Sequence, residues 1–302
     1  MTNLTWKPSF SASALHAAQA IAAKQSLTDP ALIASLTPSA RALDTIMVEW
    51  LGTASARGWR LLVGLASGIE SNHALSEKWI RRLRVGGAGE TSLIARLAGA
   101  ISDVEAATTL AYPKLLEQLL LRGRPLQEQW IGYGRGLMAH VRRLTEDTWL
   151  VPEAEAILVH PVLGGAGYPY PTLDRFSIEA VLTNPLAELP EVVRVAWLVC
   201  QLQADLPAFV EELSPGRAEP IVALASLVAT IAAAEVLELS RCDEATIQLA
   251  IEHWQIAIPA LDDIASLLIP WWETYLQTRP PWSIALRALD KMLIGQNLAS
   301  LG

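Results

Sequence analysis

The stretch Pro152–Pro185, PEAEAILVHPVLGGAGYPYPTLDRFSIEAVLTNP, departs from the helical pattern of the rest of the chain. Two runs within it, Ala154–His160 and Arg175–Leu182, carry β-branched residues and partly alternate apolar with polar side chains. The loop between them contains three glycines, three prolines and two tyrosines. This pattern predicts a long β-hairpin, at about residues 154–182, inserted into an otherwise helical protein.

Most of the remaining chain has helical periodicity and is rich in Leu and Ala, which favour helix. Helices are expected near residues 11–24, 30–36, 39–54, 58–67, 72–84, 91–111, 113–122 and 126–145, and after the hairpin near 190–206, 208–213, 219–240, 243–256, 261–278 and 282–297. Hydrophobic residues make up 52% of the chain and charged residues 18%, as in packed globular proteins. The predicted fold class is therefore mainly α, a multi-helix orthogonal or bundle-like globule with one inserted β-hairpin.

Charge divides the chain into two unlike halves. Residues 1–150 contain 16 basic and 12 acidic residues, a balance of +4, whereas residues 151–302 contain 7 and 19, a balance of −12, which together give the net charge of −8. We expect residues 1–150 to form a basic helical half, residues 151–185 the hairpin insertion and residues 186–302 an acidic helical half. Because the connections are short, the halves should share one core. An acidic half disfavours nucleic acid as a partner.

Cysteine content and apolar runs bear on the compartment. The two cysteines, Cys200 and Cys242, have neither a disulfide framework nor the spacing of metal ligands. The N-terminus, MTNLTWKPSF, lacks the charged and apolar regions of a secretory signal. The apolar run at residues 221–234 is too short for a bilayer span of roughly 20 residues. We expect a cytoplasmic protein with no membrane partner, no metal and no cofactor.

The loop of the predicted hairpin is the first candidate site. Glycines let the backbone approach a ligand closely, tyrosines combine apolar area with a polar tip, and a histidine can act as a base near neutral pH. The candidate residues are His160, Gly164, Gly165, Gly167, Tyr168, Tyr170, Asp174, Arg175 and Glu179. The alternative is a structural loop, whose prolines and glycines set its path and whose tyrosines pack over the helices.

A second candidate is the segment PWWETYLQTRPPW at residues 270–282, which has three of the chain's 11 tryptophans. So many indoles in one segment are not expected to find buried partners for all their N–H groups. An exposed aromatic patch marks an interface, so Trp271, Trp272 and Trp282 are predicted to contact a partner or a second copy of the chain. The alternative is that these rings close the core.

The five histidines form no helical pair and no HExxH motif, and no catalytic set is apparent. The favoured function is therefore a non-catalytic protein-interaction or scaffold role, in a homo-oligomer or with a protein partner, through the hairpin loop and the Trp-rich segment. The alternative is a small-ligand-binding protein or an enzyme, with a pocket under residues 160–179. A more distant alternative is an all-α enzyme of the terpenoid-synthase kind, which needs aspartate clusters to hold magnesium. The nearest matches, Asp262-Asp263 and Gln201 with Asp205, do not complete such an aspartate-rich metal motif.

Overall fold

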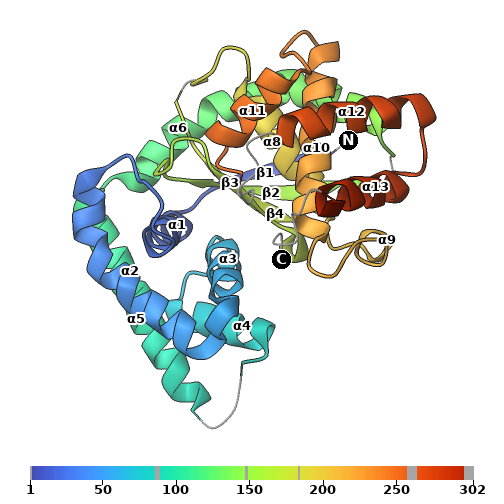
Figure 1. The fold of residues 1–302 in the computed structure, drawn as a ribbon. Helices are drawn as coiled ribbons and strands as arrows, with labels where there is room; N and C mark the ends of the chain where they lie inside the picture. Colours follow the sequence, from blue (N-terminus) through green and yellow to red (C-terminus); the bar gives the residue numbers. More distant parts are fainter. Residues whose placement is uncertain (1, 86–88, 147–148, 183, 257–263, 296–302) are drawn as a thin grey trace.

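The computed structural model describes residues 2–85, 89–146, 149–182, 184–256 and 264–295, and confirms a mainly α fold with a small sheet (Figure 1). The helices are α1 Phe10–Ala22, α2 Pro30–Leu51, α3 Ser55–Ala66, α4 Asn72–Leu83, α5 Glu90–Ala111, α6 Leu115–Gln129, α7 Arg135–Leu144, α8 Glu191–Cys200, α9 Pro207–Val210, α10 Ala218–Val236, α11 Glu244–His253, α12 Ile264–Thr278 and α13 Trp282–Gly295. The strands are β1 Asn3–Pro8, β2 Glu153–Val159, β3 Gly167–Tyr170 and β4 Arg175–Glu179.

The sheet has the order β1-β2-β4-β3, which corrects the predicted hairpin. Both sequence runs form strands, but β2 and β4 are parallel neighbours, with Glu155 opposite Arg175 and Val159 opposite Glu179. The antiparallel hairpin is instead β3–β4, joined through a 3₁₀ turn, η4, at Pro171–Leu173. Alternation identifies a strand and its buried face, whereas the choice of partner depends on packing elsewhere in the chain. β1, which pairs in parallel with β2, was not predicted at all.

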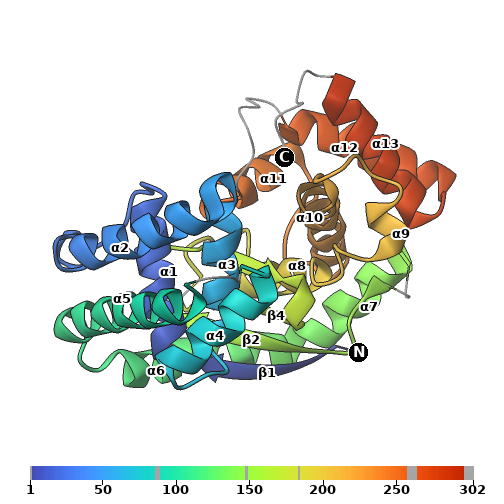
Figure 2. The same ribbon diagram turned by 90° about the horizontal axis from the view of Figure 1, so that it is seen from below.

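Each face of the sheet packs against a different helical cluster (Figure 2). Ile157 and Val159 of β2 join the cluster built from α1 to α5, here called the N-terminal core. Ala156 and Leu158, which alternate with them, join the cluster formed by α6 to α8 and the C-terminal helices, here called the C-terminal core. The sheet therefore lies between the two cores and contributes side chains to both.

Two predicted helix boundaries disappear in the structure. Residues 30–51 form one helix, α2, although Pro38 lies inside it. Its start is capped by the Asp29 carboxylate, which accepts hydrogen bonds from the N–H groups of Ala31 and Leu32. The helices α6 and α7 are joined through a π-helical turn, η2, at Trp130–Gly134, so that the chain stays helical from Leu115 to Leu144.

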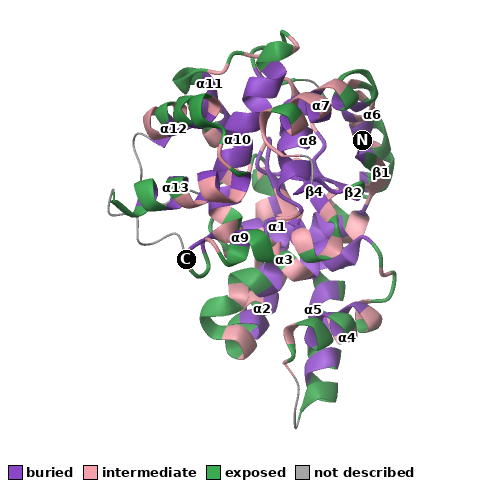
Figure 3. Cartoon of the chain, turned by 90° about the vertical axis from the view of Figure 1, so that its right-hand side faces the viewer, coloured by how far each residue is buried: buried purple, intermediate pink, exposed green. Residues whose placement is uncertain are grey.

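Helix α10 runs through the C-terminal core (Figure 3). Over the residues that the structure describes, it is the one helix long and apolar enough to cross a membrane, with a mean hydropathy of 1.7. However, 72% of that window is buried within the protein, as in the core helix of a globular domain. The ten residues of its neighbour α8 are all buried as well.

The prediction of an exposed aromatic patch is wrong. Trp271 and Trp272 are each 3% exposed and Trp282 is 0% exposed, because α12 and α13 turn these rings toward each other. Tyr275 lies among them, with its ring centroid 5.2 Å from that of Trp282. The indole N–H of Trp271 donates to the carbonyl of Ala285 (3.1 Å), whereas that of Trp282 is buried without a hydrogen-bond partner among the described residues. These residues close the C-terminal core.

Candidate functional site

A polar column of three side chains on β4, two of them buried and the third 22% exposed, faces the N-terminal core. Because side chains alternate along a strand, Phe176 and Ile178 join the C-terminal core, while Arg175, Ser177 and Glu179 face the opposite way. Ser177 and Glu179 are 1% and 0% exposed. A buried polar column is costly unless every group in it has a partner.

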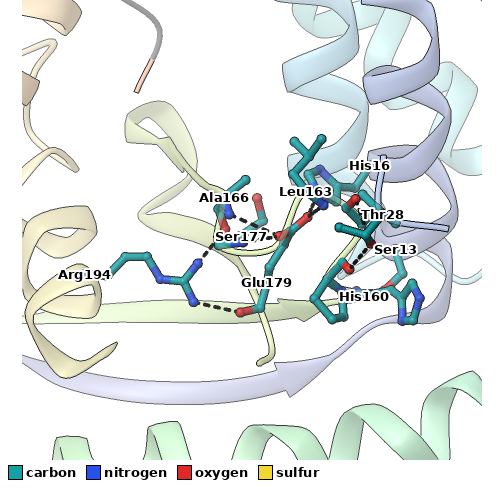
Figure 4. Close-up of polar contacts among 12 residues, drawn as sticks. Ser13, His16, Thr28, His160, Leu163, Ala166, Ser177, Glu179 and Arg194 are labelled. Atoms are coloured by element: carbon teal, nitrogen blue, oxygen red, sulfur yellow. Dashed lines mark hydrogen bonds and ion pairs between the residues drawn. The ribbon is translucent and has the colours of Figure 1, made fainter. Parts of the chain in front are cut away.

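Glu179 has four partners (Figure 4). Its Oε1 accepts the N–H of Leu163 (2.7 Å) and lies 2.9 Å from Nε2 of His16 on α1. Its Oε2 accepts the N–H groups of Gly165 (2.7 Å) and Ala166 (3.1 Å). Burial by itself would raise the pKa of Glu179, but the hydrogen bonds from His16 and the backbone hold that pKa below its ordinary value. The carboxylate is therefore held ionised in the interior.

Arg194 on α8 closes the same loop from its other side. Its guanidinium donates to the carbonyls of Ala166 (3.0 Å) and Glu179 (2.8 Å), and also pairs with the carboxylate of Glu191. Despite that partner, burial raises the pKa of Glu191. Residues 163–166 of the predicted contact loop are therefore tied into the interior by one carboxylate and one guanidinium. Thr172 and Asp174, at the far end of the loop, are exposed.

The glycines of this loop are needed for packing. A Cβ on Gly165 would lie 2.6 Å from the carbonyl oxygen of His253, and one on Gly167 would lie 2.6 Å from Leu198. Gly164 has a φ of +84°, a conformation that side-chain-bearing residues rarely adopt. The close approach that the sequence predicted for these glycines is made with the protein's own helices.

His160 does not join Glu179 in a catalytic pair. Its ring points away from Glu179 (Figure 4) and lies against the ring of Tyr112, with the centroids 4.3 Å apart. The Tyr112 hydroxyl in turn donates to Asp29. Burial, and next the charge of Arg122, lower the pKa of His160 to about 4. The imidazole is therefore neutral and packed at ordinary pH.

The remaining candidates lie along the column from His16 to Arg175. The ring of Tyr168 has its centroid 6.1 Å from that of His16, and the Tyr170 hydroxyl is 2.9 Å from Oγ of Ser177. Arg175 donates to the carbonyl of Gly64 and the hydroxyl of Ser67, which fastens it to α3. Asp174 is exposed in the left-handed turn between η4 and β4.

A groove of about 490 Å³ opens beside this end of the sheet, between the two cores; we call it the inter-core groove. Its floor is residues 169–173, which are the end of β3 and η4. The wall from the N-terminal core consists of Arg57, Arg60 and Leu61 of α3 with Arg82 and Leu83 of α4. The wall from the C-terminal core consists of Ala204, Asp205, Val210, Gly216, Ala218 and Glu219. Apolar side chains and aromatic Tyr170 thus line a hollow whose rim is charged.

The two walls carry opposite charge. Arg57, Arg60 and Arg82 make the N-terminal wall basic, and Asp205 and Glu219 make the other acidic. Arg60 Nη1 lies 3.0 Å from Glu219 Oε2 and bridges the walls. Burial raises the pKa of Asp205, and the charges of Asp174 and Glu219 raise it further.

Sequence reasoning pointed to residues 169–173 but missed both walls of the inter-core groove. Charges on two helices far apart in the chain have no common sequence pattern, so no signal was available for Arg57, Arg60 or Glu219. Arg194 did have a signal, because it is the one charged residue in the apolar run VVRVAWLVC. Such a residue in a buried helix must have partners.

The aspartate motif of the terpenoid-synthase alternative is not assembled in the described part of the chain. No group of three or more His, Cys, Asp or Glu side chains there is placed to hold a metal ion. Asp262 and Asp263 lie outside the described residues. Gln201 is buried and donates back to the carbonyl of Trp197, while Asp205 lines the inter-core groove.

No protein-family model, curated protein or solved structure matches the chain.

Proposed function

We propose that this protein binds a small molecule in the inter-core groove. The observation that carries the proposal is the groove itself, about 490 Å³ of space with an apolar floor and a charged rim. Ligand sites are typically concave and mainly apolar, with a few polar groups that orient the ligand, and they often lie where two structural units meet. This is the ligand-binding alternative from the sequence, with the pocket beside residues 169–173 instead of under the whole 160–179 segment.

The floor is well suited to a flat apolar group. Tyr170 is 5% exposed because its ring packs against Gly64 of α3 and its hydroxyl lies 2.9 Å from Oγ of Ser177, so it supports the floor and offers only an edge to a ligand. Pro169, Pro171 and Leu173 extend this apolar surface. The turn is held by the β3–β4 ladder and by the hydrogen bond from Arg175 of β4 to Gly64 of α3. The floor is therefore preorganised, and ligand binding does not have to pay the entropy of ordering it.

An interaction or scaffold role stays a prediction, although most of the two surfaces on which it was based is buried. Residues 162–167 are mostly buried beneath α8 and α11, and the Trp-rich segment closes the C-terminal core. A partner or a second copy of the chain would have to contact the exposed end of the loop, at Thr172 and Asp174, or another surface.

The test is a fluorescence titration with N-phenyl-1-naphthylamine, a neutral aromatic dye that brightens in apolar surroundings. Wild-type protein should bind it saturably at one site. Val210→Trp, at the end of α9, should fill the groove and weaken binding at least tenfold, because Val210 lines the groove and is 50% exposed.

The matched control is Val236→Trp. Val236 is also the last residue of a helix, is 56% exposed and does not line the groove. This variant should bind the dye like the wild type. Equal binding by both variants, or no saturable binding by the wild type, would refute the proposed site.

A further inference from the structure

The basic wall of the inter-core groove is suited to an anion. Arg57 and Arg60 are three residues apart on α3 and so lie on one side of that helix, and Arg82 joins them from α4. Among the described residues, neither Arg57 nor Arg82 has an ion-pair partner within 4.0 Å. A guanidinium stays charged at all physiological pH values, and its planar array of donors matches a carboxylate, phosphate or sulfonate group.

Arg60 already has an anionic partner from the opposite wall. Its Nη1 lies 3.0 Å from Glu219 Oε2, across the space that a ligand would enter. The two side chains are 46% and 57% exposed, and ion pairs this exposed contribute little to stability. An incoming anion can therefore replace the Glu219 carboxylate at small cost.

We propose, resting on the proposed ligand site, that the ligand is an apolar molecule with an anionic group, and that Glu219 competes with this group for Arg60. The apolar body lies on Pro169, Pro171 and Leu173, and the anionic group lies at the arginine wall. The Glu219 carboxylate competes with the ligand anion for Arg60. A ligand anion must therefore bind Arg60 more favourably than Glu219 does in order to displace it.

The experiment compares two dyes that share one aromatic body. 1-Anilinonaphthalene-8-sulfonate is N-phenyl-1-naphthylamine with a sulfonate, so the ratio of their affinities reports the contribution of the anion. Arg60→Gln should weaken sulfonate-dye binding about fivefold, whereas Glu219→Gln should strengthen it about two- to fivefold, as expected for one exposed charge pair. Each effect is measured as the ratio of the two dye affinities, in which a change in groove shape that affects both dyes equally cancels. Added salt should weaken only the sulfonate dye.

A double variant separates competition from a general change in charge. If Glu219 acts by occupying Arg60, Glu219→Gln should bring no gain in an Arg60→Gln background. An equal gain in both backgrounds would show that Glu219 acts only through its negative field, and it would contradict the proposed competition.

The control pair is Arg96 with Glu49, which are 45% and 47% exposed, lie 2.7 Å apart and are outside the groove. Arg96→Gln and Glu49→Gln should leave the affinity for both dyes unchanged.

The two proposals fail in different ways. Loss of neutral-dye binding in Val210→Trp combined with no sulfonate effect would keep the groove as the site and reject an anionic ligand.

Competition experiments identify the anion. 1-Naphthyl phosphate and 1-naphthoate carry the two common biological anions on the same ring system, and 1-naphthol carries none. Displacement of the sulfonate dye by either acid at concentrations where 1-naphthol has no effect supports the proposal and shows which anion is preferred. Equal displacement by all three would overturn it.

Discussion

Nε2 of His16 on α1 lies 2.9 Å from Oε1 of Glu179 at the end of β4, and both side chains are buried. These residues are 163 positions apart, and their contact joins the first helix to the fourth strand through the polar column. The same carboxylate holds the N–H groups of residues 163, 165 and 166. One side chain therefore connects the N-terminal core, the sheet and the loop that packs on α8.

Removing the charge of Glu179 should destabilise the whole protein. In Glu179→Gln one acceptor oxygen becomes an NH₂ group, which would face N–H donors and leave buried groups without partners. We expect a loss of about 3 kcal/mol in the free energy of unfolding, measured by urea denaturation. Glu155→Gln, on the neighbouring strand with a carboxylate 22% exposed, is the control and should cost much less. Equal losses for the two variants would contradict the central role of Glu179.

Stability should decrease as the pH falls through the range from 6.5 to 4, because of His160. Its pKa in the folded protein is lowered to about 4 by burial and by Arg122, whereas an unfolded histidine titrates near 6.5. Between these values the unfolded state binds a proton that the folded state does not. The free energy of unfolding therefore decreases as the pH falls. The full difference is roughly 3 kcal/mol.

The measurement is urea unfolding at a series of pH values. His160→Gln should flatten the dependence between pH 5 and 6.5. The control His73→Gln, whose side chain is 64% exposed on α4, should not flatten it. Asp29, Glu179 and His16 also act on His160 through their charges, and the lowered pKa of Glu179 adds a further loss of stability in more acidic solution. An unchanged slope in His160→Gln would exclude His160 as the source.

Two glycine substitutions should change stability in opposite directions. Gly165→Ala would place a Cβ 2.6 Å from the His253 carbonyl and should destabilise by about 2–3 kcal/mol, as overpacking does. Gly99 lies exposed inside α5 with nothing within 4 Å of a Cβ. Gly99→Ala should therefore stabilise by about 0.5–1 kcal/mol through helix propensity. Thermal denaturation of both variants tests the pair, and a stabilised Gly165→Ala would show that the loop can move away from α11.

Trp272→Ala should act on folding and leave the oligomeric state unchanged. The ring is 3% exposed among Trp271, Tyr275 and Trp282, so its removal leaves a cavity and should cost about 3–5 kcal/mol. Urea unfolding measures the loss, and light scattering measures the mass. Tyr133→Ala, which truncates an aromatic side chain 46% exposed, should be nearly neutral. A change of mass with unchanged stability would restore the interface hypothesis for this segment.

Local pattern predicted much of the fold. The partial alternation in residues 175–182 predicted a strand there, and the structure has β4 at Arg175–Glu179. Helical periodicity placed most helices within a few residues of their bounds. These features depend on neighbours in sequence, which is why they could be identified without the tertiary structure.

Tertiary structure alone decided which segments meet. Asn3–Lys7 of β1 alternate polar with apolar side chains, a signal that the sequence prediction missed. However, the pairing of β1 with β2, and the parallel pairing of β2 with β4, depend on how both faces of the sheet are covered. Trp271 and Trp282 are buried because α12 and α13 face each other, which the composition of the segment does not reveal. The inter-core groove brings Arg60 within 3.0 Å of Glu219, 159 residues along the chain. Such contacts follow from the packing of whole helices, and the sequence around the residues that make them does not predict the contact.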